Sequence, residues 1–226
     1  MSTFALIHGA GDGGWYWHLV EPRLRARGHD VVAPDLPADD DSLTLDDYAD
    51  AVVAAVGDAP DLVVVGQSFG GFTAPLVAAR RPVRALVLVA AMVPAPGESP
   101  EQWWAATGYR EAVRRQAALD GGLTGNDDPY VAFCHDVPRP LAEEALSRDR
   151  AHPSPAAYTQ PWPLPAWPAV PTRFVLCTQD RFFPADLLRR VAVERLGVVP
   201  AEIAASHCVA LSRPEELADL LTTGTG

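Results

Sequence analysis

The sequence predicts an α/β protein: a mostly parallel sheet of six strands, helices on both faces of the sheet, and one inserted segment. Two observations lead to this prediction. Short apolar runs alternate with segments of helical spacing, and the alternation is interrupted once, between residues 93 and 168. Alternating strands and helices are typical of a parallel sheet that helices cover on both sides.

The first 92 residues contain four of the predicted strands. These are the apolar runs 4–7, 31–33, 62–65 and 83–91. Helical spacing is found between them, over residues 15–27, 44–56 and 69–80. The run 62–65 is continuously apolar, which is typical of a strand buried on both faces of a sheet.

The pattern changes after residue 92. Residues 93–168 lack strong strand runs and contain four tryptophans and many prolines. Two further strands are predicted at 172–177 and 198–204, with helices at 184–196 and 214–221. We therefore predict a core domain of residues 1–92 and 169–226. Residues 93–168 are predicted to form a cap, or lid, over the carboxyl ends of the strands, where open α/β sheets bind ligands.

Size and charge narrow the classes of partner. The chain has 226 residues, of which 48% are apolar, and this suits a single domain with a modest insertion. Its net charge is −11, so no basic face is expected to bind nucleic acid. Every basic residue other than histidine is an arginine, and the absence of lysine excludes Schiff-base chemistry. We expect a small-molecule substrate, and we leave a homodimer open.

The cysteines and the amino terminus predict a cytoplasmic protein. Cys134, Cys177 and Cys208 are odd in number and lack metal-binding spacing, so we expect reduced thiols and no metal site. The first residues lack the basic region and the apolar length of a signal peptide. No apolar run is long enough to span a bilayer, so no membrane partner is expected.

Ser68 is the candidate nucleophile. The motif Gly66-Gln67-Ser68-Phe69-Gly70 lies directly after one predicted strand and directly before a predicted helix. A G-x-S-x-G motif in this setting is typical of a nucleophile elbow, a sharp turn that exposes the serine hydroxyl above the sheet. The same pattern can arise by chance in a glycine-containing turn, but the strand and the helix around it favour the elbow.

His207 and Asp180 are the candidate base and acid. His207 follows the last predicted strand, whereas His135 and His152 fall in the insertion and are expected at the surface or in the cap, with substrate contact left open for either. Asp180 follows the strand 172–177. In sites that are built around a nucleophile elbow, the serine, the acid and the histidine follow one another in this order along the chain. The alternative for Asp180 is an N-cap of the next helix, and its position slightly before that helix favours the catalytic role.

A glycine-rich turn after the first strand is the candidate oxyanion hole. We expect one donor to be the N–H of Phe69, the residue after the nucleophile, and the other to be the N–H of Ala10. His8 is expected to hold this turn. The stretch from Gly9 to Gly14 lacks the spacing and the lysine of a phosphate-binding loop.

These motifs resemble those of the α/β-hydrolase superfamily and, within it, the plant methylesterase and hydroxynitrile lyase branch. The resemblance rests on His8-Gly9-Ala10 with Gly14-Trp15 and Trp17, Gly66-Gln67-Ser68-Phe69-Gly70-Gly71, Cys177-Thr178-Gln179-Asp180, and Ser206-His207. It implies the α/β-hydrolase fold. By this similarity Ser68, Asp180 and His207 form the catalytic triad, and Ala10 and Phe69 supply the oxyanion hole.

Two departures within this branch favour the esterase pattern. The lyases have threonine where this chain has Gly9, and lysine where it has Cys208. The hydroxyl and the ammonium group that cyanohydrin cleavage uses are therefore both missing. The segment after Pro34-Asp35-Leu36-Pro37 also departs from the pattern of the branch, and we expect it to shape the pocket differently.

The predicted function is hydrolysis of a small to medium hydrophobic carboxylic ester, with no metal or organic cofactor. The substrate contacts that we expect are Gly9, Trp103, Trp104, Tyr130 and Phe133, with Met92 and Tyr109 as further candidates, although each aromatic residue also suits the core of the cap. Two alternatives remain open because a fold does not define a reaction. One is a lyase, C–C hydrolase or cyclising enzyme that uses the same triad. The other is a non-catalytic ligand-binding protein.

Overall fold

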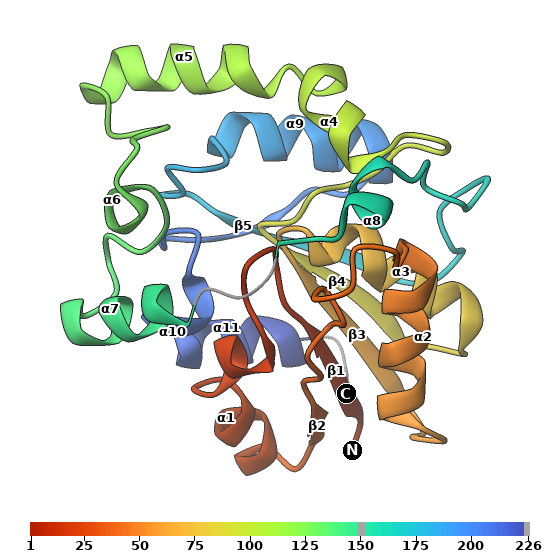
Figure 1. Ribbon diagram of the computed structural model, residues 1–226. Coiled ribbons are helices and arrows are strands. Elements are labelled where there is room, and N and C mark those ends of the chain that lie inside the picture. Colours follow the sequence, from red (N-terminus) through yellow and green to blue (C-terminus); the bar gives the residue numbers. More distant parts are fainter. Residues whose placement is uncertain (149–151, 224–226) are drawn as a thin grey trace.

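The computed structural model describes residues 1–148 and 152–223. Six strands form one sheet, in the order β2-β1-β3-β4-β5-β6, and all neighbouring pairs are parallel (Figure 1). The strands are β1 (Thr3–Ile7), β2 (Asp30–Val32), β3 (Leu62–Gln67), β4 (Ala85–Val89), β5 (Thr172–Cys177) and β6 (Ala201–Ile203). The predicted six-stranded α/β fold is confirmed, with a sheet that is entirely parallel.

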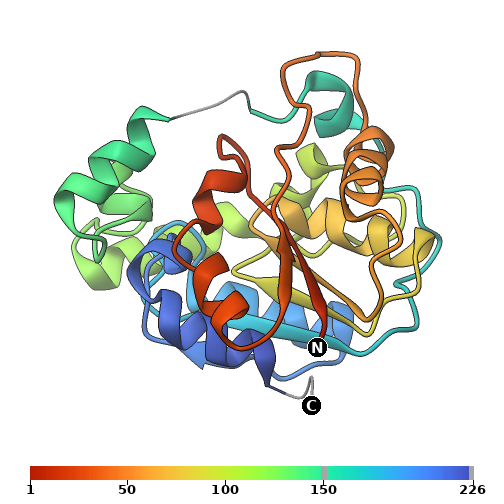
Figure 2. The ribbon, with the colours of Figure 1, turned by 90° about the horizontal axis from the view of Figure 1, so that it is seen from below.

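Helices cover both faces of this sheet. The helices outside the segment between β4 and β5 are the 3-10 helix η1 (Gly14–Trp17), α1 (Glu21–Ala26), α2 (Leu45–Val56), α3 (Gly70–Arg80), α9 (Ala185–Leu196), α10 (Val209–Ser212) and α11 (Pro214–Thr222). Helix α2 packs against α3, and α1 packs against α11. The two pairs lie on opposite sides of the strands (Figures 1 and 2). Every residue of β1, β3 and β4 is buried, as expected for strands covered on both faces.

The segment between β4 and β5 is helical. It contains α4 (Pro100–Ala106), α5 (Tyr109–Asp120), α6 (Pro129–Phe133), α7 (Arg139–Ser147) and α8 (Pro155–Thr159), and no strand among its described residues. One indole N–H group ties it to helix α3, and a second forms a hydrogen bond within the segment. Trp162 donates to the carbonyl oxygen of Phe72 in α3 at 3.1 Å, and Trp103 donates to that of Val93 at 3.1 Å.

Two predicted elements differ from the structure because of prolines. The single helix predicted over residues 15–27 is divided into η1 and α1, and Pro22 lies in the first turn of α1, where its missing N–H is tolerated. The strand predicted over 198–204 is reduced to β6, which begins directly after Pro200. No helix in the described part of the chain is both long and apolar enough to cross a membrane.

The loops that carry the candidate functional residues come together because parallel strands end at the same edge of a sheet. Gly9 and Ala10 follow β1, Ser68 follows β3, Asp180 follows β5 and His207 follows β6. Residues far apart in the sequence therefore meet above the carboxyl ends of the strands.

Candidate active site

Ser68 lies at a sharp turn between β3 and α3. Its φ angle is +51°, a left-handed conformation that non-glycine residues rarely adopt. The turn is held at the Ser68 carbonyl oxygen, which accepts the N–H of Met92 at 2.9 Å and that of Gly71 at 3.1 Å. A Cβ at Gly66 would lie 2.7 Å from the carbonyl oxygen of Gly70, so the chain approaches itself too closely here for a side chain.

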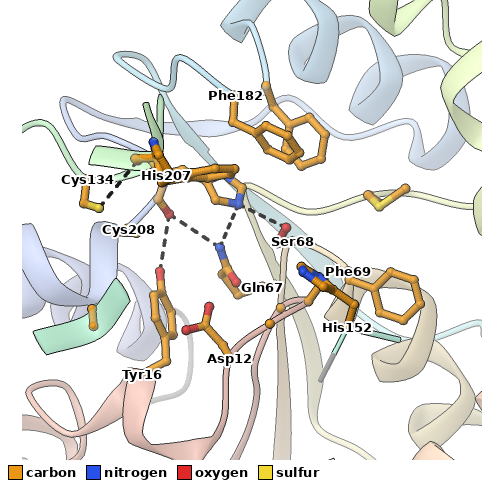
Figure 3. Close-up of a pocket in the computed structure, with 18 of the residues that line it drawn as sticks. Asp12, Tyr16, Gln67, Ser68, Phe69, Cys134, His152, Phe182, His207 and Cys208 are labelled. Carbon is orange, nitrogen blue, oxygen red and sulfur yellow. Dashed lines mark hydrogen bonds between the residues drawn. The ribbon is translucent and has the colours of Figure 1, made fainter. Parts of the chain in front are cut away.

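Ser68, His207 and Asp180 form a hydrogen-bonded chain, and Figure 3 shows the link between Ser68 and His207. The distance from Ser68 Oγ to His207 Nε2 is 3.0 Å, and that from His207 Nδ1 to Asp180 Oδ2 is 2.7 Å. All three residues are buried. A carboxylate only accepts, so Nδ1 carries the proton toward Asp180 and leaves Nε2 of the neutral imidazole to accept the serine hydroxyl.

Asp180 is fixed by its own loop. Its Oδ1 accepts the N–H groups of Phe182 at 2.8 Å and of Phe183 at 2.9 Å, while Oδ2 faces His207. The N-cap of α9 is Pro184, so Asp180 does not have the alternative capping role. The carboxylate is thus oriented before any substrate binds.

His207 is also held through its main chain. Its carbonyl oxygen accepts the hydroxyl of Tyr16 at 3.3 Å and the side-chain N–H of Gln67 at 3.4 Å (Figure 3). Burial raises the pKa of Tyr16 well above its usual range, so this phenol keeps the proton that it donates. The Gln67 amide nitrogen also lies 3.2 Å from His207 Nε2.

The glycine-rich turn after β1 lies beside Ser68. His8 connects this turn to the loop after β2: its Nδ1 is 2.8 Å from the carbonyl oxygen of Gly9, and its Nε2 accepts the N–H of Leu36 at 3.0 Å. Ala10 and Phe69 both line the cavity above Ser68. Within the described ranges 1–148 and 152–223, the fold uses neither of their N–H groups in a backbone hydrogen bond.

A cavity of about 740 Å³ opens above these groups. It is bounded by the loops after the strands and by residues of the 93–168 segment. Its larger apolar lining residues are Met92, Trp104, Phe133, Leu146, Tyr158, Phe182, Phe183 and Leu211. The rings of Phe182 and Phe183 lie 5.2 and 5.3 Å from the imidazole of His207, so apolar surface directly adjoins the imidazole.

The structure divides the expected substrate contacts into two groups. Gly9, Trp104 and Phe133 line the cavity, as does Met92. Trp103 and Tyr130 do not: Trp103, in α4, is fully buried, and the Tyr130 ring packs under the guanidinium of Arg139.

Tyr109 is also displaced from its expected position. Its ring packs against Trp104 and Phe182, behind the residues that face the cavity. None of Trp103, Tyr130 and Tyr109 lines the cavity, so the structure does not support their expected contact with a substrate.

Several lining residues were not expected from the sequence. Phe182 and Phe183 follow Asp180 directly, and two aromatic residues next to a predicted catalytic acid were an available signal. Tyr158 had no such signal; it accepts the indole N–H of Trp104 at 2.9 Å. His152, for which the sequence left substrate contact open, also lines the cavity.

The described residues contain no group of three or more His, Cys, Asp or Glu side chains arranged to hold a metal ion. The polar groups that line the cavity include the hydroxyls of Ser68 and Tyr16, the imidazole of His207, the amide of Gln67 and the carboxylate of Asp12. Such a set can activate a serine oxygen and bind a developing negative charge.

Comparison with known proteins agrees with the fold and the motifs. A family model described as "Alpha/beta hydrolase family" matches residues 4–220. The chain is similar to Esterase PIR7B of Oryza sativa subsp. japonica, with 29% identity over 250 residues, 96% of this chain and 93% of that protein. It is also similar to Norfluorocurarine synthase 1 of a Strychnos species, with 24% identity over 249 residues and the same two shares.

A solved structure gives the same fold. A pyrethroid hydrolase from Sphingobium faniae JZ-2 superposes with a TM-score of 0.78 and 24% identity, over 99% of this chain and 97% of that chain. The resemblance to plant esterases that the motifs predicted is confirmed by these matches.

Proposed function

Because the chain belongs to the alpha/beta hydrolase family, we propose that it is a serine hydrolase that cleaves small to medium hydrophobic carboxylic esters through an acyl-enzyme on Ser68. The observation that carries the proposal is the hydrogen-bonded chain from Ser68 through His207 to Asp180 at the floor of an apolar cavity. The similarity to a plant esterase supports it.

In the first step, the Ser68 oxygen attacks the ester carbonyl and His207 Nε2 takes its proton. Asp180 holds the Nδ1–H tautomer and stabilises the imidazolium that forms. The tetrahedral intermediate then breaks its bond to the alkoxy oxygen, which leaves as the alcohol with the proton from Nε2. The acyl group remains on Ser68.

In the second step, water attacks the acyl-enzyme. His207 removes a proton from the water, the carbonyl oxygen again becomes negative, and the bond to Ser68 Oγ breaks with return of the proton. The acid is released and the resting site is restored. Asp180 plays the same part in both steps.

The N–H groups of Ala10 and Phe69 are the proposed oxyanion donors. One belongs to the turn after β1 and the other to the residue directly before α3, and both residues line the cavity with Ser68. Loss of one such donor typically lowers turnover by about 10²–10³-fold.

The cavity supports an apolar substrate. Its aromatic lining next to His207 suits a hydrophobic acyl or alcohol group, and water near the acyl-enzyme must enter past these rings. We propose that residues 93–168 act as the lid of this site, since Trp104 and Phe133 from this segment contribute to its wall. The three free cysteines support a reducing, cytoplasmic location.

A second candidate function comes from the similarity to a synthase. The same triad would then catalyse a lyase or cyclising reaction, as the name Norfluorocurarine synthase 1 suggests for that relative. Gly9 and Cys208 argue against the cyanohydrin lyase pattern in particular. Analysis of the products from one converted substrate separates hydrolysis from these outcomes.

The test is labelling with a fluorophosphonate followed by peptide mass spectrometry, beside hydrolysis of short p-nitrophenyl esters. We expect one adduct, on Ser68, that is lost in Ser68→Ala and strongly reduced in His207→Ala. Ser147→Ala, at an exposed position in α7, is the matched control and should label normally.

Two negative results of this experiment would lead to different conclusions. An adduct on Ser68 without ester turnover would favour the lyase or cyclising reaction. A folded protein without an adduct would contradict an activated serine and favour the ligand-binding alternative.

A further inference from the structure

Gln67 is a buried amide in direct contact with the proposed catalytic base. It is the last residue of β3, next to Ser68, and is only 1% exposed. Its side-chain nitrogen lies 3.4 Å from the carbonyl oxygen of His207 and 3.2 Å from His207 Nε2 (Figure 3). The reaction described above assigns no part to this residue.

The hydrogen-bond partners determine which end of the Gln67 amide faces His207. A carbonyl oxygen only accepts, so the NH₂ group must be the end that points to it. The opposite end, Oε1, is buried and has no hydrogen-bond partner among the described residues. An unpaired buried oxygen is destabilising, so the contacts of the NH₂ group with His207 must hold this orientation.

Gly9 provides the room for this arrangement. A Cβ at position 9 would lie 2.6 Å from Gln67 Oε1 and 2.9 Å from Ser68 Cβ. Any side chain there would push the amide away from its place beneath the site. The absence of a side chain at position 9 and the orientation of Gln67 are therefore linked.

The position of the amide has a consequence at Nε2. This nitrogen is approached by two donors, the Ser68 hydroxyl at 3.0 Å and the Gln67 N–H at 3.2 Å. A proton on Nε2 would face the Gln67 N–H and weaken that contact. The amide therefore favours the neutral imidazole, which is the form that accepts the serine proton.

The other titratable groups around His207 are those of the elements packed against it. They are Asp180 after β5, Tyr16 in η1, Asp12 in the turn after β1, Cys134 and Asp136 after α6, Cys208 next in the chain, and His152 across the cavity. A substitution of Gln67 leaves all of these side chains in the protein. A change in the pH profile of such a variant therefore reports on the amide.

We propose that Gln67 is a positioning residue for His207, which holds the base by its carbonyl oxygen and keeps Nε2 unprotonated in the resting enzyme. This inference rests on the proposed function, since it assigns Gln67 a part in the same serine chemistry. Tyr16 shares the first of these two tasks, because its hydroxyl also donates to the His207 carbonyl oxygen. Of Gln67 and Tyr16, it is Gln67 whose side chain also lies beside Nε2.

The difference between these two residues gives the experiment its control. The fluorophosphonate labelling rate of Ser68 is measured from pH 5 to 9 in the wild type, Gln67→Met, Gln67→Glu and Tyr16→Phe. We expect the acid limb of the profile to move to higher pH by about one unit in Gln67→Met, and further in Gln67→Glu, whose carboxylate would attract a proton to Nε2. Tyr16→Phe should label more slowly but keep the acid limb of the wild type.

The outcome that overturns the proposal is an unchanged acid limb in both Gln67 variants. Gln67→Glu has nearly the shape of the wild-type side chain, so it keeps the test valid if Gln67→Met does not fold. Titration of the His207 imidazole by NMR, assigned by its loss in His207→Ala, gives a readout that does not need activity. If wild-type Ser68 does not label at all, the proposed function fails, and this titration still decides the role of Gln67.

Discussion

Replacement of Asp180 by asparagine tests how the acid works. In the structure, Oδ1 accepts two main-chain N–H groups, from Phe182 and Phe183, and Oδ2 accepts the imidazole N–H of His207. An asparagine oxygen must take the place of Oδ1, because the two N–H groups need an acceptor. The asparagine NH₂ group then faces His207 Nδ1 and donates to it. This forces the proton onto Nε2, which can no longer accept the proton of Ser68.

Asp180→Asn is expected to lower the turnover strongly and to change the free energy of unfolding little. The wrong tautomer at an orienting aspartate lowers turnover by about 10⁴-fold, and this corresponds to about 5 kcal/mol of transition-state stabilisation. The fold is retained in Asp180→Asn because both N–H groups keep a partner. In Asp180→Ala these groups lose it, and each one left buried costs about 1–3 kcal/mol of stability.

The assay is kcat for a p-nitrophenyl ester, together with urea unfolding of both variants. Asp136→Asn is the matched control: Asp136 accepts the N–H of Ser206 at 3.1 Å, so it is a carboxylate near the base that does not contact the imidazole. Near-normal turnover in Asp180→Asn, or an equal loss in Asp136→Asn, would refute the reasoning.

Three further predictions follow from other contacts. Gly71→Ala places a Cβ only 1.9 Å from the carbonyl oxygen of Met92. We therefore expect a loss of stability of about 1–3 kcal/mol or more, measured by urea unfolding, and a lower turnover. Unchanged stability and turnover would contradict the close packing of Gly71 against Met92. Burial lowers the pKa of His29 below its usual 6.5, so the free energy of unfolding should fall as the pH decreases below about 6.5 and His29 is forced to protonate. His29→Gln, which can still accept the N–H of Ser2, should lack that part of the pH dependence in unfolding curves recorded between pH 7 and 5. Phe182→Ala should raise KM for long-chain esters much more than for acetate esters, because its ring forms the cavity wall beside the base, and equal effects on both would argue against that position.

The sheet and the candidate triad could be predicted from the sequence because the sequence patterns that indicate them are local. The strand predicted over residues 172–177 agrees with β5 at both ends. A buried apolar run, a G-x-S-x-G motif and a following helix leave few alternatives for residues 62–80. Once a parallel sheet is predicted, its carboxyl edge must bring the loops after β3, β5 and β6 together. The prediction of one helix over 15–27 failed because helical spacing continued across the break before Pro22.

The cavity wall was harder to predict because it depends on how helices pack onto the sheet. Trp103 and Trp104 are neighbours in α4, and successive helical residues point about 100° apart. One indole is therefore fully buried and the other faces the cavity, and the sequence alone contains no signal for which is which. The part of Gln67 was also hidden, since it occupies a variable position of the motif and contacts a residue 140 positions away.

The most direct test of the central claim is the capture of the acyl-enzyme. The protein is mixed with a p-nitrophenyl ester, quenched in acid within the first turnover, and digested for mass spectrometry. We predict the acyl group on the peptide that contains Ser68, together with a burst of p-nitrophenol equal to the enzyme concentration, and neither in Ser68→Ala. Steady ester turnover with no acyl group on Ser68, or with turnover retained in Ser68→Ala, would contradict the account.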